Sequence, residues 1–214
     1  MQLVKRSYAG LMQTIAGLGP LEKLTAEARD SDPYGWRRWA ASLFAIHNIE
    51  RMIELDLPWW NVAATRVAED YLRAHPDARV FEYGAGASTI WLAHRSASLV
   101  SVEHHAEWYR LLAAKVAPFA NIRLLHRDLD GEAYIDAIAE AEGPFDLIVI
   151  DGRRRTECLA RATPHLKQGG IILFDDSGRR RYRSAIETCG LPERRYYGRS
   201  YCVPYPDHTS LLHG

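Results

Sequence analysis

Two kinds of apolar run alternate over the last two thirds of the chain. Short, nearly unbroken runs are typical of strands buried on both faces of a parallel sheet, whereas apolar residues that recur every three or four positions are typical of the helices that cover such a sheet. Their alternation predicts an α/β fold. The expected strands are residues 79–83, 99–103, 121–126, 145–151 and 171–174. The expected helices are one that begins at Ile90 and others at residues 106–119, 132–141 and 156–166.

The first third of the chain has a helical periodicity instead. Residues 34–57 are expected to form one amphipathic helix that ends at Pro58, and residues 61–74 are expected to form a second helix before the first strand. These helices either cap the mouth of a site or cover one edge of the sheet. Of the adjacent Trp59 and Trp60, we expect one ring to pack in the core, and the role of the other is left open.

The first strand runs into a turn with two glycines, Gly84 and Gly86. Glycines let backbone amides approach a ligand closely, and the N-terminus of the following helix adds a partial positive charge. Ser88 and Thr89 stand at the expected N-cap of this helix. Thr89 also occupies the third small-residue position of an NAD or FAD site, and Glu82 would repel a pyrophosphate but pair with an ammonium group. The turn therefore favours a nucleotide-like ligand over a dinucleotide, with an ordinary strand-to-helix turn as the alternative.

Four of the five expected strands end in carboxylates, and a fifth acid, Asp128, lies just past the end of the third strand. Parallel strands end at the same edge of a sheet, and ligands bind outside this edge near the point where the strand order reverses. Each acid alone fits a solvated loop, but together they are expected to face one crevice. Glu103 lies seventeen positions after Gly86, a spacing that suits the binding of ribose hydroxyls, and Asp128 is placed to accept a hydrogen bond from an exocyclic amine. The acids are Glu82, Glu103, Asp128, Asp151, Asp175 and Asp176.

The composition narrows the range of partners. The chain has 214 residues with 27 Lys and Arg and 27 Asp and Glu, so its formal net charge is zero. Without a global positive field, neither nucleic acid nor a membrane surface is an expected partner. The three cysteines lack C-x-x-C spacing, which favours a reduced, cytoplasmic protein. No signal peptide is evident, and no stretch approaches the roughly twenty apolar residues of a membrane span.

Four motifs stand in order between residues 76 and 178, and together they are far more specific than any one of them. They are residues 81–89, 101–104, 145–153 and 166–176. This set resembles the class I S-adenosylmethionine-dependent methyltransferases. The resemblance implies a doubly wound, seven-stranded, mostly parallel sheet with helices on both faces and a C-terminal antiparallel hairpin, for which the candidates are residues 194–201 and 209–212. The chain then divides into an N-terminal helical extension, residues 1–75, and a Rossmann-like methyltransferase domain, residues 76–214.

The same resemblance assigns a cofactor, S-adenosylmethionine, to the glycine turn and the strand ends. Glu82 and the turn would hold its methionine part. Glu103 would bind its ribose, and His104 and Asp128 would surround its adenine. The full set of implied cofactor-binding residues is Glu82, Gly84, Gly86, Ser88, Thr89, Glu103, His104, Asp128 and Asp151.

Asp151, Asp175 and Asp176 resemble the metal-binding carboxylates of catechol O-methyltransferase and related magnesium-dependent enzymes. Oxygen ligands of this kind suit Mg²⁺, which would lower the pKa of a bound hydroxyl group. Asp151 and Asp176 are accordingly the candidate catalytic residues. Arg154 stands where the catechol enzymes carry a lysine base, and an arginine does not deprotonate, so that step does not transfer. The alternative is that the three acids serve only the cofactor and the fold.

Two arginine runs, residues 153–155 and 179–181, follow the fourth and fifth strands. Both are expected to project from the sheet edge beside the acids. They form a cationic rim that recruits an anionic small molecule with a carboxylate or a phosphate group. The alternative is that they are surface arginines whose positive charge offsets that of the acidic crevice.

These observations favour an S-adenosylmethionine-dependent methyltransferase that acts on a small-molecule acceptor, with oxygen as the favoured atom. One alternative is a nucleotide- or dinucleotide-binding oxidoreductase, which Glu82 and Thr89 disfavour. Another is a non-catalytic binding protein on the same fold. A nucleic-acid acceptor is disfavoured by the balanced charge and by the lack of an N-P-P-Y-type motif.

Overall fold

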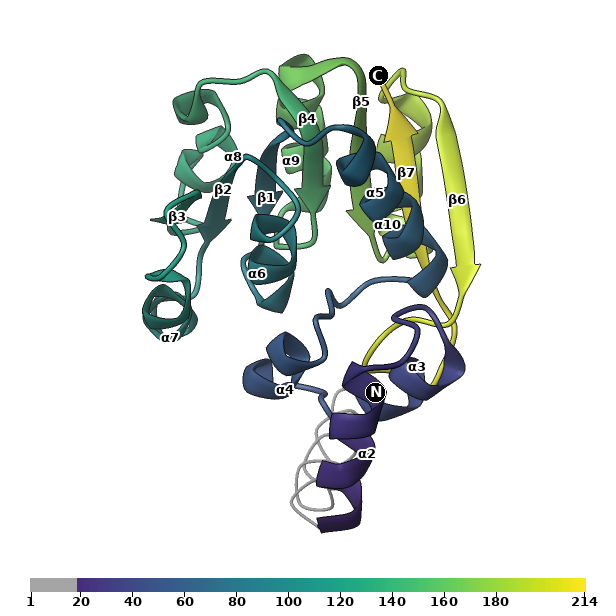
Figure 1. Ribbon diagram of the computed structural model, residues 1–214. Helices are drawn as coiled ribbons and strands as arrows, with labels where there is room; N and C mark the ends of the chain where they lie inside the picture. Colours follow the sequence, from purple (N-terminus) through teal and green to yellow (C-terminus); the bar gives the residue numbers. More distant parts are fainter. Residues whose placement is uncertain (1–18) are drawn as a thin grey trace.

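Seven strands form one sheet in the computed structural model, which describes residues 19–214 (Figure 1). The strands are β1 (Arg79–Tyr83), β2 (Ser98–Glu103), β3 (Ile122–His126), β4 (Phe145–Ile150), β5 (Leu166–Asp175), β6 (Glu193–Gly198) and β7 (Asp207–His213). Their order is β3-β2-β1-β4-β5-β7-β6. β7 runs antiparallel to β5 and β6, and the other neighbours are parallel. The expected doubly wound, seven-stranded sheet with its C-terminal hairpin is therefore confirmed.

The helices that connect the strands cover both faces of the sheet. They are α6 (Ala87–Ala93), α7 (Ala106–Val116), α8 (Ala133–Asp136), α9 (Arg155–Ala162) and α10 (Arg180–Thr188), with 3₁₀ turns η1 (Ala139–Ala141) and η2 (Thr163–His165). The helices before the sheet are α2 (Gly19–Arg29), α3 (Trp36–Ser42), α4 (Ile49–Glu54) and α5 (Val62–Ala74). No described helix is long and apolar enough to cross a membrane.

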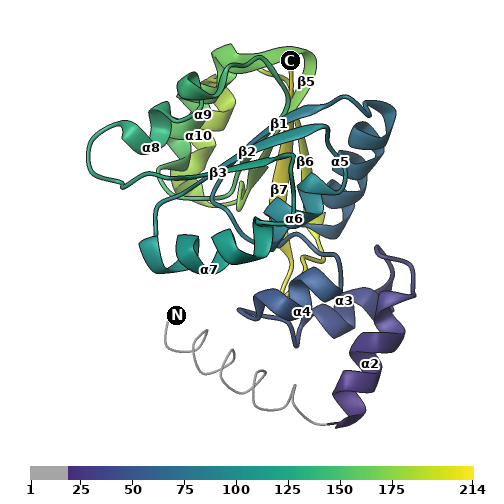
Figure 2. The same ribbon diagram turned by 60° about the vertical axis from the view of Figure 1, so that its left-hand side comes forward.

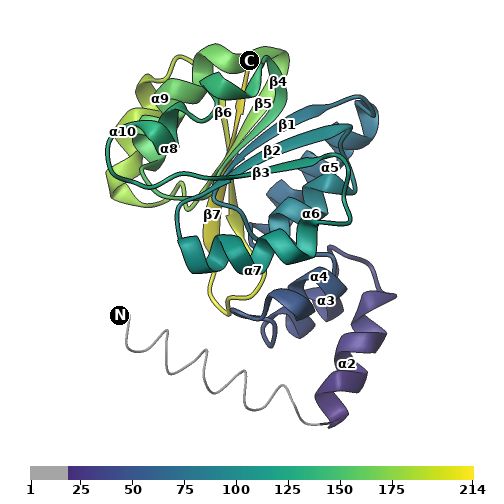
Figure 3. The ribbon, with the colours of Figure 1, turned by 90° about the vertical axis from the view of Figure 1, so that its left-hand side faces the viewer.

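Both faces of the central strands are apolar because both are covered. In β4, Ile148 and Ile150 face a core formed with α8, α9 and α10, whereas Leu147 and Val149 face a second core formed with α5 and α6. Figure 3 shows these two groups of helices on opposite sides of the sheet. A strand that is buried on both faces needs an unbroken apolar run, which is why the runs in the sequence are continuous.

The expected single helix at residues 34–57 is wrong. The chain forms α3 and α4 with a turn between them, since His47 has a φ of +56°, which interrupts a right-handed helix. The side chain of Asn48 then caps α4 by accepting a hydrogen bond from the amide of Arg51 at 3.0 Å. The expected helix at residues 61–74 is confirmed as α5.

The other differences concern helix ends and the start of β5, which begins at Leu166 rather than at residue 171. α6 begins at Ala87 rather than Ile90, with Gly86 as its N-cap, so Ser88 and Thr89 lie inside its first turn. The expected helices at 132–141 and 156–166 each end early and continue as the 3₁₀ turns η1 and η2. α10 has no counterpart among the expected helices, because it is rich in arginine and buries only Tyr182 and Ile186.

Two of the helices before the sheet, α3 and α4, lie next to the loop between β6 and β7 (Figure 2). The indole N–H of Trp39 donates to the carbonyl of Ser200 at 2.9 Å, and the amide of Cys202 donates to Oγ of Ser42 at 2.9 Å. This packing brings α4 and the loop over the edge at which β1 and β4 end. The part of the expected extension before residue 19 lies outside the described residues, and its boundary at residue 75 stays a prediction.

Candidate active site

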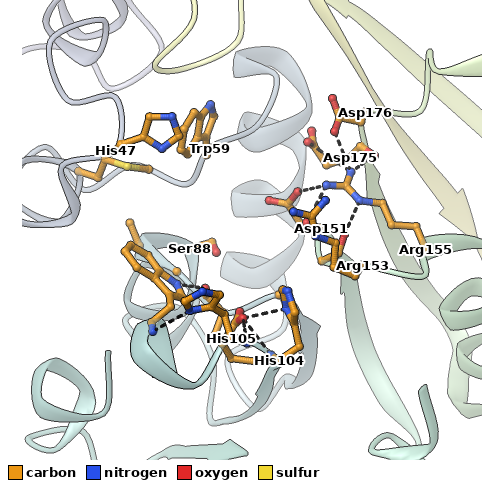
Figure 4. Close-up of a pocket in the computed structure, with 18 of the residues that line it drawn as sticks. His47, Trp59, Ser88, His104, His105, Asp151, Arg153, Arg155, Asp175 and Asp176 are labelled. Carbon is orange, nitrogen blue, oxygen red and sulfur yellow. Dashed lines mark hydrogen bonds and ion pairs between the residues drawn. The ribbon is translucent and has the colours of Figure 1, made fainter. Parts of the chain in front are cut away.

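A cavity of about 980 Å³ opens at the carboxyl edge of the sheet (Figure 4). It lies where the strand order reverses between β1 and β4, the place at which doubly wound folds bind ligands. Most of the expected site residues line it, namely Gly84, Gly86, Ser88, Glu103, His104, Asp151, Asp175 and Asp176. Glu82, Thr89 and Asp128 are not among the lining residues.

The turns that follow β1 and β4 touch through Gly84 and Gly152. Gly84 has a φ of +94°, and a Cβ atom at this position would lie 2.5 Å from Cα of Gly152. Glycine is required here by both the backbone and the contact. Gly86 is different, because its backbone is extended and a Cβ atom would meet only Oγ of Ser88, at 3.8 Å. Gly86 therefore leaves space in the cavity wall.

Glu82 lies fully buried behind this turn. Its carboxylate accepts hydrogen bonds from Oγ of Ser88 at 2.5 Å, Oγ1 of Thr89 at 2.6 Å and Oγ of Ser101 at 2.6 Å. Burial raises the pKa of Glu82 to about 7, and the three hydroxyl donors only partly offset this effect. Glu82 therefore holds the turn from beneath, and Ser88 is the member of this cluster that reaches the cavity.

Glu103, at the end of β2, lines the cavity with one fixed and one free oxygen. Oε1 accepts hydrogen bonds from the amides of His104 at 2.9 Å and His105 at 2.7 Å. Nδ1 of His104 lies 2.9 Å from the same oxygen. Oε2 has no hydrogen-bond partner in the described part of the chain. The backbone thus orients the carboxylate and leaves Oε2 available to a ligand.

Asp128 does not join this group. Its side chain is 77% exposed, and Oδ1 lies 3.8 Å from Nε2 of His126. Asp128 does not line the cavity, whereas His104 does. The same ring nitrogen of His126 lies 3.2 Å from the carbonyl oxygen of His104, so Asp128 stays near His104 but outside the cavity lining.

Asp151, directly after β4, is held from both sides. Oδ2 accepts a hydrogen bond from the indole N–H of Trp60 at 3.1 Å, and Oδ1 accepts one from Nη2 of Arg155 at 2.7 Å. Burial raises the pKa of Asp151 to about 6, since it outweighs the opposing effect of Arg155. Trp60 is fully buried, which confirms the expected core ring, and Trp59 lines the cavity.

Arg155, the first residue of α9, lies among the three acids that were expected to bind a metal ion (Figure 4). Nη2 is 2.7 Å from Oδ1 of Asp151, and Nη1 is 3.3 Å from Oδ2 of Asp176 and 3.7 Å from Oδ2 of Asp175. The side chain is only 8% exposed. The guanidinium group therefore occupies the space between the acids and supplies their counter-charge.

The expected Mg²⁺ site does not fit this arrangement. The described residues contain no group of three or more His, Cys, Asp or Glu side chains that could hold a metal ion. The carboxylate oxygens are present, but they face the buried guanidinium group of Arg155. A divalent ion in the same space would be repelled at close range by its positive charge. Asp151, Asp175 and Asp176, as arranged around Arg155, therefore do not fit the Mg²⁺ ion that the resemblance implied.

Asp175 and Asp176 both reach Arg155 although they are adjacent in the chain. In an extended strand, neighbouring side chains point to opposite faces. Asp176 has a φ of +57°, so this alternation ends at the last residue of β5. Oδ1 of Asp175 also accepts a hydrogen bond from Oγ1 of Thr209 at 2.7 Å. Burial and the charge of Asp151 raise the pKa of Asp175 well above its ordinary value.

The two arginine runs contribute unequally to the cavity. Arg153, Arg179 and Arg181 line it together with Arg155, whereas Arg154 and Arg180 do not. Arg179 pairs with Oδ2 of Asp176 at 2.6 Å. Arg154 is bound instead to Glu132 and Glu157 outside the cavity. The side chain of Arg153 is exposed and makes no hydrogen bond or ion pair with any residue that the structure describes.

An apolar wall faces these charged groups across the cavity. It consists of residues from the segment around α4 and from the β6–β7 loop, including His47, Met52, Trp59, Val203 and Tyr205. The rings of His47 and Trp59 meet edge to face, with centroids 5.0 Å apart. The part of the wall from α4 fits the expectation that the helices before the sheet cap the mouth of a site. Sequence reasoning missed the part from the loop, because the loop lies about 150 positions from α4 and carries no motif.

The fold is that of the class I S-adenosylmethionine-dependent methyltransferases, and the glycine turn and strand-end acids of the site resemble those of that class. Residues 81–177 match the family model described as a methyltransferase domain. This segment begins in β1 and ends just after β5, so it contains the glycine turn, Glu103 and the acids around Arg155. No curated protein matches the chain.

Solved methyltransferase structures are similar to this chain in fold. A candidate O-methyltransferase from Klebsiella pneumoniae is 20% identical, with a TM-score of 0.59 over 86% of this chain and 90% of its own. The precorrin-6y C5,15-methyltransferase from Geobacter metallireducens is 14% identical, with a TM-score of 0.56 over 71% of this chain and 89% of its own. A candidate methyltransferase from Streptococcus mutans, solved with S-adenosylhomocysteine, is 14% identical, with a TM-score of 0.51 over 70% of this chain and 97% of its own.

Proposed function

We propose that this enzyme transfers the methyl group of S-adenosylmethionine to an oxygen atom of a small, anionic acceptor. The observation that carries the proposal is that the glycine turn, the free oxygen of Glu103 and the carboxylate of Asp151 all face one cavity within a methyltransferase domain. The complex of the Streptococcus mutans protein with S-adenosylhomocysteine supports the choice of cofactor.

The residues on the cofactor side fit a nucleoside with a cationic tail. Oε2 of Glu103 has the chemistry to accept hydrogen bonds from ribose hydroxyls. Gly86 leaves space for the backbone of the turn to approach the tail, and Oγ of Ser88 stands beside it. A cavity of about 980 Å³ is large enough for a cofactor and an acceptor together, since ligand sites commonly measure about 300–1,000 Å³.

Asp151 is the group best placed to take a proton from the acceptor. The cofactor supplies a methyl group already activated by a positively charged sulfur. The acceptor hydroxyl must lose its proton as its oxygen gains the methyl group, and the enzyme must hold the two reactants in line. Asp151 has a raised pKa of about 6, so it is both ionised near neutral pH and more basic than an ordinary aspartate.

Arg153 and Arg181 support an anionic acceptor. Both line the cavity, and Arg153 has no counter-charge among the described side chains. Arg181 donates to the hydroxyl of Tyr182 at 2.7 Å and lies 4.7 Å from the centroid of its ring, which fixes its direction. An arginine binds a carboxylate or a phosphate through two parallel hydrogen bonds. The apolar wall around Trp59 would then contact the uncharged part of the acceptor.

Calorimetry tests the cofactor, and a transfer assay tests the acceptor. The wild-type enzyme should bind S-adenosylmethionine and S-adenosylhomocysteine equally well with and without EDTA. With radiolabelled methyl donor, hydroxylated aromatic acids and phosphate-bearing alcohols should be labelled, and matched compounds without the anionic group should be labelled poorly. Binding without any transfer to these compounds would contradict the acceptor class alone, whereas a lack of binding would contradict the whole proposal.

A further inference from the structure

Four of the five N–H donors of Arg155 make hydrogen bonds to oxygen atoms of the chain. Nε donates to the carbonyl of Gly152 at 3.0 Å, and Nη2 donates to the carbonyl of Asp151 at 2.7 Å and to its Oδ1 at 2.7 Å. Nη1 donates to the carbonyl of Asp175 and lies 3.3 Å from Oδ2 of Asp176. The guanidinium is therefore enclosed by backbone carbonyls and carboxylates, which take up four of its five N–H groups by hydrogen bonds.

This set of oxygens is the kind of shell that a hard divalent cation prefers. Mg²⁺ and Ca²⁺ are bound by carboxylates and carbonyl oxygens, and the number of charged ligands sets their affinity. A guanidinium carries a permanent positive charge and presents its donors in a fixed plane. The guanidinium thus bonds to the same oxygen atoms, and it cannot dissociate from the protein as a metal ion can.

We infer that Arg155 is a resident cation that takes the place of a divalent metal ion at this sheet edge. It supplies the counter-charge of Asp151 and orients its carboxylate, so that the enzyme works without a metal, and it makes a metal site latent in the chain. Arg155 is a positioning residue, because it acts through the acids and backbone carbonyls that it holds. Its effect on turnover rests on the proposed function, but the latent metal site does not.

Two substitutions separate the charge of Arg155 from its shape. Arg155→Gln removes the cation, whereas Arg155→Lys keeps a positive charge in the same space. Calorimetry with Mn²⁺ should show binding by the Gln variant that is stronger than in the wild type by about tenfold or more, and no such gain in the Lys variant. Mn²⁺ should also raise the Tm of the Gln variant and leave that of the wild type unchanged.

Terbium luminescence places the ion in the cluster. Because Trp60 donates to Asp151, Tb³⁺ bound by the acids should emit when tryptophan is excited in the Gln variant. Adding Asp175→Asn to that variant should abolish the emission, as it removes one of the three carboxylates. Arg179→Ala is the matched control, since Arg179 also pairs with Asp176 but is 44% exposed, and its loss should create no binding site.

Two measurements on the wild-type enzyme test the inference even if the Gln variant fails to fold. Its turnover should be the same after dialysis against EDTA as with added Mg²⁺. Tb³⁺ added to the wild-type enzyme should also give no tryptophan-sensitised emission from the acid cluster, that is, no emission that disappears when Asp175→Asn is introduced. Either a loss of turnover in EDTA or such an emission would overturn the inference. A folded Gln variant that binds Mn²⁺ no better than the wild type would overturn it as well, whether or not the proposed methyl transfer is observed.

Discussion

The indole N–H of Trp60 lies 3.1 Å from Oδ2 of Asp151, although the two residues are 91 positions apart. Trp60 is fully buried and meets Trp91 edge to face, with ring centroids 5.7 Å apart. The segment before the sheet thus orients the carboxylate at the centre of the site. This hydrogen bond also opposes the rise in the pKa of Asp151 that burial causes.

Replacing Trp60 with Phe should therefore raise the pKa of Asp151 without changing the fold. The loss of one hydrogen bond to a charged group corresponds to about 1.5–3 kcal/mol, or roughly one to two pKa units, so kcat near neutral pH should fall because less Asp151 is ionised. The pH at which kcat is half maximal should move upward, because Asp151 would be harder to ionise. Trp91→Phe is the control, as it packs against Trp60 without reaching Asp151, and it should leave the pH profile in place.

Asp151→Asn should lower kcat by about 10²–10⁴, the usual range for the loss of a general base, while S-adenosylhomocysteine binding stays within a few fold. In the wild type, kcat should rise with pH through about 6, because only ionised Asp151 accepts a proton. Single-turnover rates across this pH range would measure both effects. Asp128→Asn, at an exposed site outside the cavity, should behave like the wild type; an equal loss in the two variants would refute the role of Asp151.

Glu103→Gln should weaken the binding of S-adenosylhomocysteine. The amide keeps the shape of the side chain but removes the charge that strengthens hydrogen bonds to ribose hydroxyls, so Kd should rise about tenfold. Calorimetry measures this directly. Glu107→Gln changes another acidic residue of the cavity wall that is exposed, and its Kd should stay close to the wild-type value. If both substitutions act alike, the effect reflects only the general charge of the cavity.

Glu82→Gln should change how stability depends on pH. The pKa of Glu82 is about 7 in the folded protein and 4.5 in the reference state, so the folded state binds the proton more tightly. Stability is then lost as pH rises between these two values, by about 3 kcal/mol at most for this group. Thermal scans from about pH 5 to about pH 8 should show a smaller decrease in Tm for the variant than for the wild type. An identical decrease would mean that the buried carboxyl ionises freely.

Arg153→Ala and Arg181→Ala should each raise KM for an anionic acceptor by about tenfold and reduce the dependence of KM on salt. The reason is that both arginines line the cavity. Arg180→Ala is the matched control, because Arg180 belongs to the same run but does not line the cavity. Steady-state kinetics at several salt concentrations give the answer, and a change in KM for Arg180→Ala equal to the others would contradict a defined anion site.

The sequence by itself determined the sheet and the edge at which the site lies. Continuous apolar runs require strands that are covered on both faces, and parallel strands must end at one edge. That is why Glu103, Asp151 and Asp175 could be expected in one crevice before any contact was known. The break between α3 and α4 was not readable in this way, because apolar residues in the turn at His47 continue the helical spacing.

Only the tertiary structure decided which way the charged side chains point. Arg154, just before α9, and Asp176, just after β5, have left-handed backbone with φ values of +49° and +57°. The chain changes direction at both places, and Arg155 thereby comes to lie between the acids. Non-glycine residues adopt that conformation only where surrounding packing stabilises it, so no local pattern announces it. The burial of Glu82 and the hydrogen bond from Trp60 arise in the same way, from contacts between segments that the folded chain alone brings together.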